Sequence, residues 1–232
     1  MTAGSGRVLG FSLAFLLFMM APAFLKGASW LHPDISWGDA FDLLTPLVLL
    51  PLYWRLLQAA GERPPGAPWT LAFLVLAALW VEGQGMHLAA NSIGHLLKST
   101  PEHAASSVTH YYDEVLSHYL WHAGVVGLAA LLFLRDLERG TKSRPGLAVL
   151  LGAVVYGFAF FVITVEGATT PLGVPAALLL VVLGLLQGPH ALKGRVQTAF
   201  WTWGHAVALL FYTGWGVYWR GLPEFSAVGI ID

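Results

Sequence analysis

Two neighbouring segments of this 232-residue chain hold most of the residues that could do chemistry. The first carries His87 and Asn91 four residues apart, and the second carries Glu114, His118 and His122 at the same interval. Because an α-helix makes a turn in about 3.6 residues, each set forms a stripe along one helix face. Imidazole and carboxylate groups on facing helices are how helical bundles bind metal ions. The spacing therefore predicts a metal site between the two segments.

The link between these segments is short, so they are expected to pack as an antiparallel hairpin folded about residue 102. This folding brings three pairs together: His87 with His118, Asn91 with Glu114, and His95 with His110. Gln84 is expected beside the first stripe and Tyr111 beside the second. Regular helix geometry points Asp113 away from the shared stripe.

Three further residues are candidates for the same site. Glu82 lies about 140° around the helix from His87, and Gly83 and Gly85 could let the helix bend there and bring the carboxylate round. The other two candidates are Glu166, at the end of the fifth predicted helix, and His205, in the last one.

The donor set restricts the metal. The chain has no cysteine, which excludes thiolate sites and leaves zinc, iron, manganese or Cu(II), with zinc or iron favoured. In a zinc version His87, His118 and His122 bind the metal, and Glu114 acts as general base in a hydrolysis. Adding Glu82, Glu166 or His205 would make a two-metal site suited to oxidation of a lipid.

Two other functional classes use the same residues. His87 and His118 could be axial ligands of a haem in an electron-transfer subunit. Alternatively, Glu82, Glu114, Glu166 and the histidines could relay protons in a proton-coupled or ion-coupled transporter. A purely structural network that braces the two helices is the remaining interpretation.

The composition places this chemistry in a membrane. Hydrophobic residues make up 56% and charged residues 11%, whereas an ordinary soluble domain carries roughly 25% charge. This excludes a disordered chain and most soluble enzymes. A net charge of -1 gives no footprint for nucleic-acid binding. The expected partners are membrane lipids and an apolar or amphipathic substrate.

We expect an all-α polytopic membrane protein, with residues 1–232 forming a single bundle of transmembrane helices. A membrane helix needs roughly 20 mostly apolar residues. Seven stretches satisfy this length, and Pro-rich or Gly-rich turns separate several of them: 8–26, 40–60, 69–97, 107–135, 146–166, 170–189 and 198–220. The first could instead be a signal peptide ending near residue 23.

Basic residues predict the orientation. With a cytoplasmic N-terminus and an external C-terminus, the inner side holds most of them, namely Arg7, Arg55, Arg63, Arg135, Arg139, Lys142, Arg144, Lys193 and Arg195. The outer side holds Lys26, Lys98 and Arg220. The chain is thus expected in a bacterial-type plasma membrane, with the His/Glu site nearer the outer leaflet. Three histidines are expected to be solvated (His32, His103 and His190), and four carboxylates to be interfacial (Asp34, Asp39, Asp42 and Asp113), with Asp39 capping the second helix.

Overall fold

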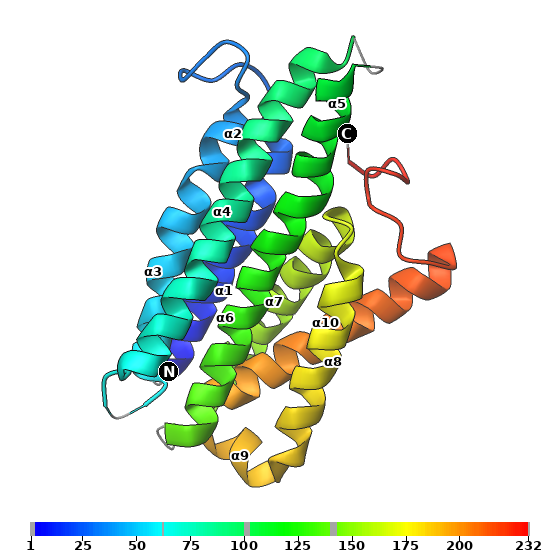
Figure 1. The fold of residues 1–232 in the computed structure, drawn as a ribbon. Helices are drawn as coiled ribbons and strands as arrows, with labels where there is room; N and C mark the ends of the chain where they lie inside the picture. The colour runs from blue at the N-terminus through cyan, green and yellow to red at the C-terminus, as the bar shows by residue number, and fades with distance from the viewer. Residues whose placement is uncertain (1–2, 62, 100–102, 140–142, 232) are drawn as a thin grey trace.

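A computed structural model describes residues 3–61, 63–99, 103–139 and 143–231, and these are helical with no strand. Figure 1 shows long helices running side by side. The elements are α1 (Ala3–Met20), η1 (Ala21–Phe24), α2 (Trp37–Asp42), α3 (Leu44–Ala59), α4 (Ala67–Leu97), α5 (Ala104–His110), η2 (Tyr111–Ser117), α6 (His118–Arg139), α7 (Leu147–Glu166), α8 (Thr170–Leu186), α9 (Gly188–Gly194) and α10 (Val196–Trp219). The expected all-α class is confirmed. The turn expected about residue 102 lies outside the described residues, as does Lys142.

Within the described residues, five spans are long and apolar enough to cross a membrane, and the number becomes six if a bent pair counts as one. The five are Gly4–Phe24, Trp37–Ala59, Ala67–Leu97, Ala104–Glu138 and Leu147–Glu166. The bent pair is α8 with α9, which meet at 102°. The expected seventh span corresponds to α10, which is not among these candidate spans, so seven crossings are not confirmed. Figure 1 shows α10 crossing the bundle obliquely and ending partway along it.

Aromatic side chains fill the centre of the bundle. Phe11 of α1 packs edge-on against Tyr53 of α3, with ring centroids 4.7 Å apart. Tyr156 of α7 meets Trp201 of α10 at 5.1 Å. All four of these side chains are buried, so α1 contributes to the same core as α7 and α10. Such aromatic pairs contribute about 0.5–1.5 kcal/mol beyond the burial of their area.

Glycine allows α4 to approach the following helix closely. A Cβ added at Gly83 would lie 2.6 Å from the backbone oxygen of Ser117 and closer still to the backbone nitrogen of Trp121. Small residues at a helix crossing let backbones come together, which is how helices associate where lipid provides no hydrophobic drive. The expected α4–α6 hairpin is confirmed by this contact. Gly83 marks the crossing, and α4 continues through it as a regular helix.

Helix lengths leave a step in the bundle. With a rise of 1.5 Å per residue, the 31 residues of α4 extend about 46 Å and the 20 residues of α7 about 30 Å. In Figure 1 the α4–α5 end of the hairpin projects beyond the turn between α7 and α8, and the C-terminal segment lies beside this step. The candidate site is at this level.

Candidate functional site

A cavity of about 750 Å³ opens at the step, and it contains most of the residues singled out above. Its walls come from the end of α1, η1, α2, α4, η2, α6, the end of α7 and the C-terminal segment. The polar and ionisable side chains that line it are Asp39, Asp42, His87, Asn91, His95, Glu114, His118, His122 and Glu166, together with Ser36 and Lys26. Its apolar lining includes Phe24, Leu25, Phe158, Val162, Ile163, Ile230 and Ile231. The cavity therefore has both ionisable and apolar lining residues.

His87 pairs with Asp113, a residue that the sequence predicts to point away from it. Its Nδ1 lies 2.7 Å from Oδ1 of Asp113. The two atoms are close enough for an ion pair, although their angle is outside that of a regular hydrogen bond. The expectation that Asp113 points away from the stripe is wrong, because Tyr111–Ser117 forms a π-helix. Bonds from i to i+5 widen the turn and rotate the following residues, and such segments are frequent at functional sites.

His118 and His122 continue the imidazole cluster. The rings of His87 and His118 have centroids 4.8 Å apart, which confirms their predicted proximity. The rings of His118 and His122 stack at 6.0 Å. Nδ1 of His122 is 2.6 Å from the hydroxyl of Thr169. Among the described residues, Nδ1 of His118 and Nε2 of His122 have no hydrogen-bond partner although both are buried. Two imidazole nitrogens are thus buried and unpartnered in the cluster.

A second polar group comes from α2, which the sequence prediction had assigned to the interface. Asp42 is buried and accepts a hydrogen bond from Nε2 of Gln84 at 3.0 Å. Nδ2 of Asn91 donates to Oδ1 of Asp39 at 2.9 Å, so its hydrogen bond goes to α2 and not to Glu114. Asp39 takes part in capping α2, although as the N3 residue and not as the N-cap that was expected. Ser36 is the N-cap residue, and Asp39 completes the capping box by accepting from its backbone N–H.

A pattern in the sequence could have predicted that Asp39 and Asp42 lie in the bundle. Ser36-x-x-Asp39 is a capping-box pattern that starts a helix, and Asp42 follows one turn later on the same face. Two carboxylates one turn apart at the start of an apolar span point into the bundle when the opposite face contacts lipid. Thr169, which lies in the turn after α7, carried no comparable signal.

The carboxylates at the rim are placed differently from one another. Glu114 lines the cavity and is half-buried. Glu166 also lines it, and its Oε2 accepts backbone hydrogen bonds from Phe225 and Ser226 at 2.8 and 3.2 Å. Glu224 lies outside the membrane-spanning segments, and partial burial together with the nearby Glu166 raises the pKa of its carboxyl. Glu166 therefore holds the C-terminal segment against the cavity.

Two predicted site residues do not join the cluster. Glu82 is exposed and is absent from the cavity wall, because α4 stays regular through Gly83 and Gly85. His205 is buried in the aromatic core, where its ring packs on Tyr156 and Phe160. Its Nδ1 is 2.7 Å from the carbonyl oxygen of Trp201. The structure thus brings His87, His118, His122, Glu114, Asn91 and Glu166 to one cavity and leaves Glu82 and His205 outside it.

The imidazole and carboxylate atoms do not converge on a common point. In the part of the chain that the structure describes, no group of three or more His, Asp or Glu side chains is arranged to hold a metal ion. The distances between the imidazole rings are nevertheless similar to those at a zinc site. Two imidazoles on one tetrahedral zinc at 2.0–2.1 Å from each nitrogen have centroids about 5 Å apart, and the observed separations are 4.8 and 6.0 Å.

Comparison of the sequence with protein-family models and curated proteins, and of the fold with solved structures, found no match.

Proposed function

We propose that this chain is a membrane-embedded, metal-dependent enzyme that acts on a lipid-like or otherwise apolar substrate. One observation carries the proposal: three histidines, His87, His118 and His122, share a cavity that also has apolar lining residues, and buried imidazole nitrogens in it lack partners. A buried polar atom without a partner costs about 1–3 kcal/mol. A bound cation would remove that cost.

The surroundings of two histidines support metal binding. Metal-ligating histidines usually direct their second ring nitrogen at a carboxylate or another polar group, which fixes the ring. Here Nδ1 of His87 faces Asp113 and Nδ1 of His122 faces Thr169. This leaves Nε2 of both rings for a metal, with His118 between them.

The arrangement favours hydrolysis at one zinc over oxidation at two metals. A second metal needs ligands beyond the three imidazoles and Glu114. Of the candidates, Glu82 is exposed outside the cavity, His205 is in the aromatic core, and Glu166 is engaged by the C-terminal segment. A single zinc with an open position would supply an activated water. Glu114 lines the same cavity, and we propose it as the group that would accept a proton from this water.

The haem alternative fits poorly. Axial ligands bind on opposite faces of the macrocycle. The rings of His87 and His118 are in contact at a centroid separation of 4.8 Å, which leaves no room for a planar cofactor between them.

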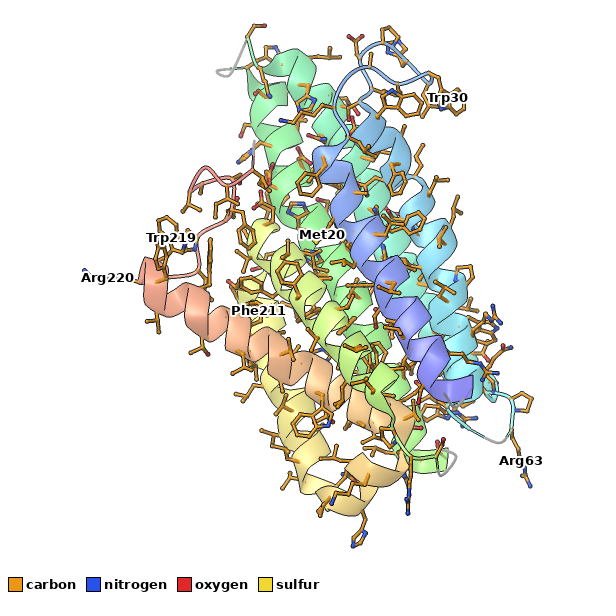
Figure 2. All side chains as sticks on the ribbon, turned by 180° about the vertical axis from the view of Figure 1, so that it is seen from behind. Met20, Trp30, Arg63, Phe211, Trp219 and Arg220 are labelled. Atoms are coloured by element: carbon orange, nitrogen blue, oxygen red, sulfur yellow. The ribbon has the colours of Figure 1, made fainter. Side chains whose placement is uncertain are left out.

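For the membrane arrangement we propose a single bundle with seven crossings, an internal N-terminus and an external C-terminus, in a bacterial-type plasma membrane. Five or six apolar spans support most of this, and α10 would be a tilted seventh. Figure 2 shows Arg63 at one end of the bundle and Trp30 at the other, as expected for an inner basic end and an outer aromatic one. The cavity would then open near the outer leaflet.

A proton-coupled transporter is the second candidate, and one observation favours it. Asp42, Glu114 and Glu166 line the same cavity as the three imidazoles. Ionisable groups in contact within a membrane are typical of proton relays.

Hydrolysis of acyl esters tests the proposal and separates it from this alternative. Detergent-purified protein would be assayed with p-nitrophenyl esters of two to sixteen carbons, before and after chelation and after zinc is added back. We expect zinc-dependent hydrolysis that increases with chain length and is lost in His118→Ala but retained in the exposed-histidine control His103→Ala. Proton flux into proteoliposomes that survives chelation, without hydrolysis, would contradict the enzyme and support the transporter.

A further inference from the structure

A second hollow, of about 1020 Å³, lies at the opposite end of the bundle from the candidate site. It is formed where α8 bends by 102° into α9, and where the segment before α7 meets the start of α10. Figure 1 shows α9 lying across this end of the molecule. The metal proposal uses none of these residues.

The charged side chains that line the hollow are cationic. Arg144, Lys193 and Arg195 line it together with His190 and Gln187, and none of the described residues on its wall carries a carboxylate. Asp136 is close enough to Arg195 to interact with its charge, whereas Arg144 and Lys193 are exposed. At neutral pH these permanently charged groups give the surface a positive potential, which attracts an anion.

Backbone contacts hold the cationic groups in place. The backbone N–H of Ser143 donates to the carbonyl oxygen of Gly194 at 2.8 Å, which ties the segment before α7 to the end of α9. Nη1 of Arg195 donates to the carbonyl oxygens of Asp136 and Leu137 at 2.7 and 2.5 Å. Both bonds use Nη1, and a guanidinium has five N–H donors, so its other edge is not required for them. Arginine in this geometry suits recognition of a phosphate oxygen.

The wall toward the bundle is apolar. Leu150 and Trp203 line the hollow and are 50% and 40% exposed, although both are large hydrophobic residues. An indole beside a basic rim is typical of the level where lipid headgroups meet acyl chains. A soluble anion would gain nothing from this wall, whereas a phospholipid would place its glycerol and upper acyl carbons against it.

We propose that this hollow binds a phosphate group, and that the group belongs to an anionic phospholipid whose chains lie along Leu150 and Trp203. Basic pockets between transmembrane helices on the cytoplasmic side bind anionic headgroups in this way. The proposal requires that this end of the bundle lie at a bilayer surface, and it is independent of whether the other cavity holds a metal.

The test is lipid binding by native mass spectrometry of the full chain in detergent, titrated with phosphatidylglycerol or phosphatidylcholine. We compare wild type with Arg144→Gln/Lys193→Gln. The control is Arg7→Gln/Arg55→Gln, which removes two exposed arginines from the same end but outside the hollow. Arg195 is left unchanged because its hydrogen bonds brace α6. Circular dichroism and a melting curve verify that each variant is folded.

We expect tight binding of one phosphatidylglycerol, weakened roughly thirty-fold in the hollow variant and little in the control. Phosphatidylcholine should bind weakly to all three proteins. Competition with inorganic phosphate identifies the source of the group. If millimolar phosphate binds in wild type and the acyl chains add no affinity, the ligand is a soluble phosphate compound and the lipid assignment is wrong. Equal phosphatidylglycerol binding by the folded hollow variant and wild type would overturn the site itself.

Discussion

Replacing Asp113 with asparagine should weaken metal binding more than it weakens the fold. The side chain keeps its shape but loses the charge that faces Nδ1 of His87 at 2.7 Å. Loss of an outer partner of a metal-ligating histidine typically costs 10–100-fold in affinity, or about 1.4–2.7 kcal/mol. We therefore expect zinc to bind Asp113→Asn 10–100-fold more weakly than wild type.

The assay is zinc titration of metal-free protein in competition with a chromophoric chelator. Asp136→Asn is the matched control. Asp136 is also buried, and it accepts hydrogen bonds from the backbone N–H and the hydroxyl of Thr198 at 2.7 Å each, near the other end of the bundle. This control should lower the melting temperature without changing zinc affinity. An unchanged affinity in Asp113→Asn, or an equal loss in Asp136→Asn, would refute the role given to Asp113.

Three further predictions follow from individual contacts. Gly83→Ala should lower the free energy of unfolding by about 1–3 kcal/mol, because the added Cβ would meet the Ser117 backbone. Gly85→Ala should be neutral or stabilising, because nothing lies within 4 Å of its added Cβ. Melting curves in detergent compare the two variants, and equal effects would count against the close crossing. Thr169→Val removes the hydroxyl beside Nδ1 of His122 and should weaken zinc binding in the same titration by a factor of about ten or more. Thr213→Val is the control that should not change zinc binding, because the exposed Thr213 hydroxyl donates to the carbonyl oxygen of Leu209 within α10. Because the folded-state pKa of Glu224 is raised, the native state binds more protons than the unfolded chain, and attachment of the C-terminal segment should weaken as pH rises through that pKa. Glu224→Gln should reduce this pH dependence, measured by hydrogen exchange at Phe225 and Ser226. An unchanged profile would contradict the assignment.

The hairpin and the contact between His87 and His118 could be predicted because both follow from local periodicity. Residues four apart on two long helices with a short link have few ways to pack, and Gly83 allows the close approach. The same reasoning located Glu114 and His122 on the cavity wall.

What the sequence did not reveal depends on departures from regular geometry. The π-helix at Tyr111–Ser117 turns Asp113 toward His87. No residue pattern in the sequence predicts this wider helical turn. Asp42 was not expected to contact the site, and it does so because the short helix α2 precedes α3 inside one span and buries this carboxylate beside Gln84. His205 was expected to join the site, but the structure places it in the aromatic core, where it packs on Tyr156.

The central claim is that His87, His118 and His122 together bind a metal ion. Its most direct test is the metal content of protein purified without chelator, measured by elemental mass spectrometry with an absorption spectrum of the same sample. We predict about one zinc per chain in wild type, none in His118→Ala, and an unchanged content in His205→Ala, whose side chain lies outside the cavity. Metal-free wild type, or equal metal in His118→Ala and wild type, would contradict the claim.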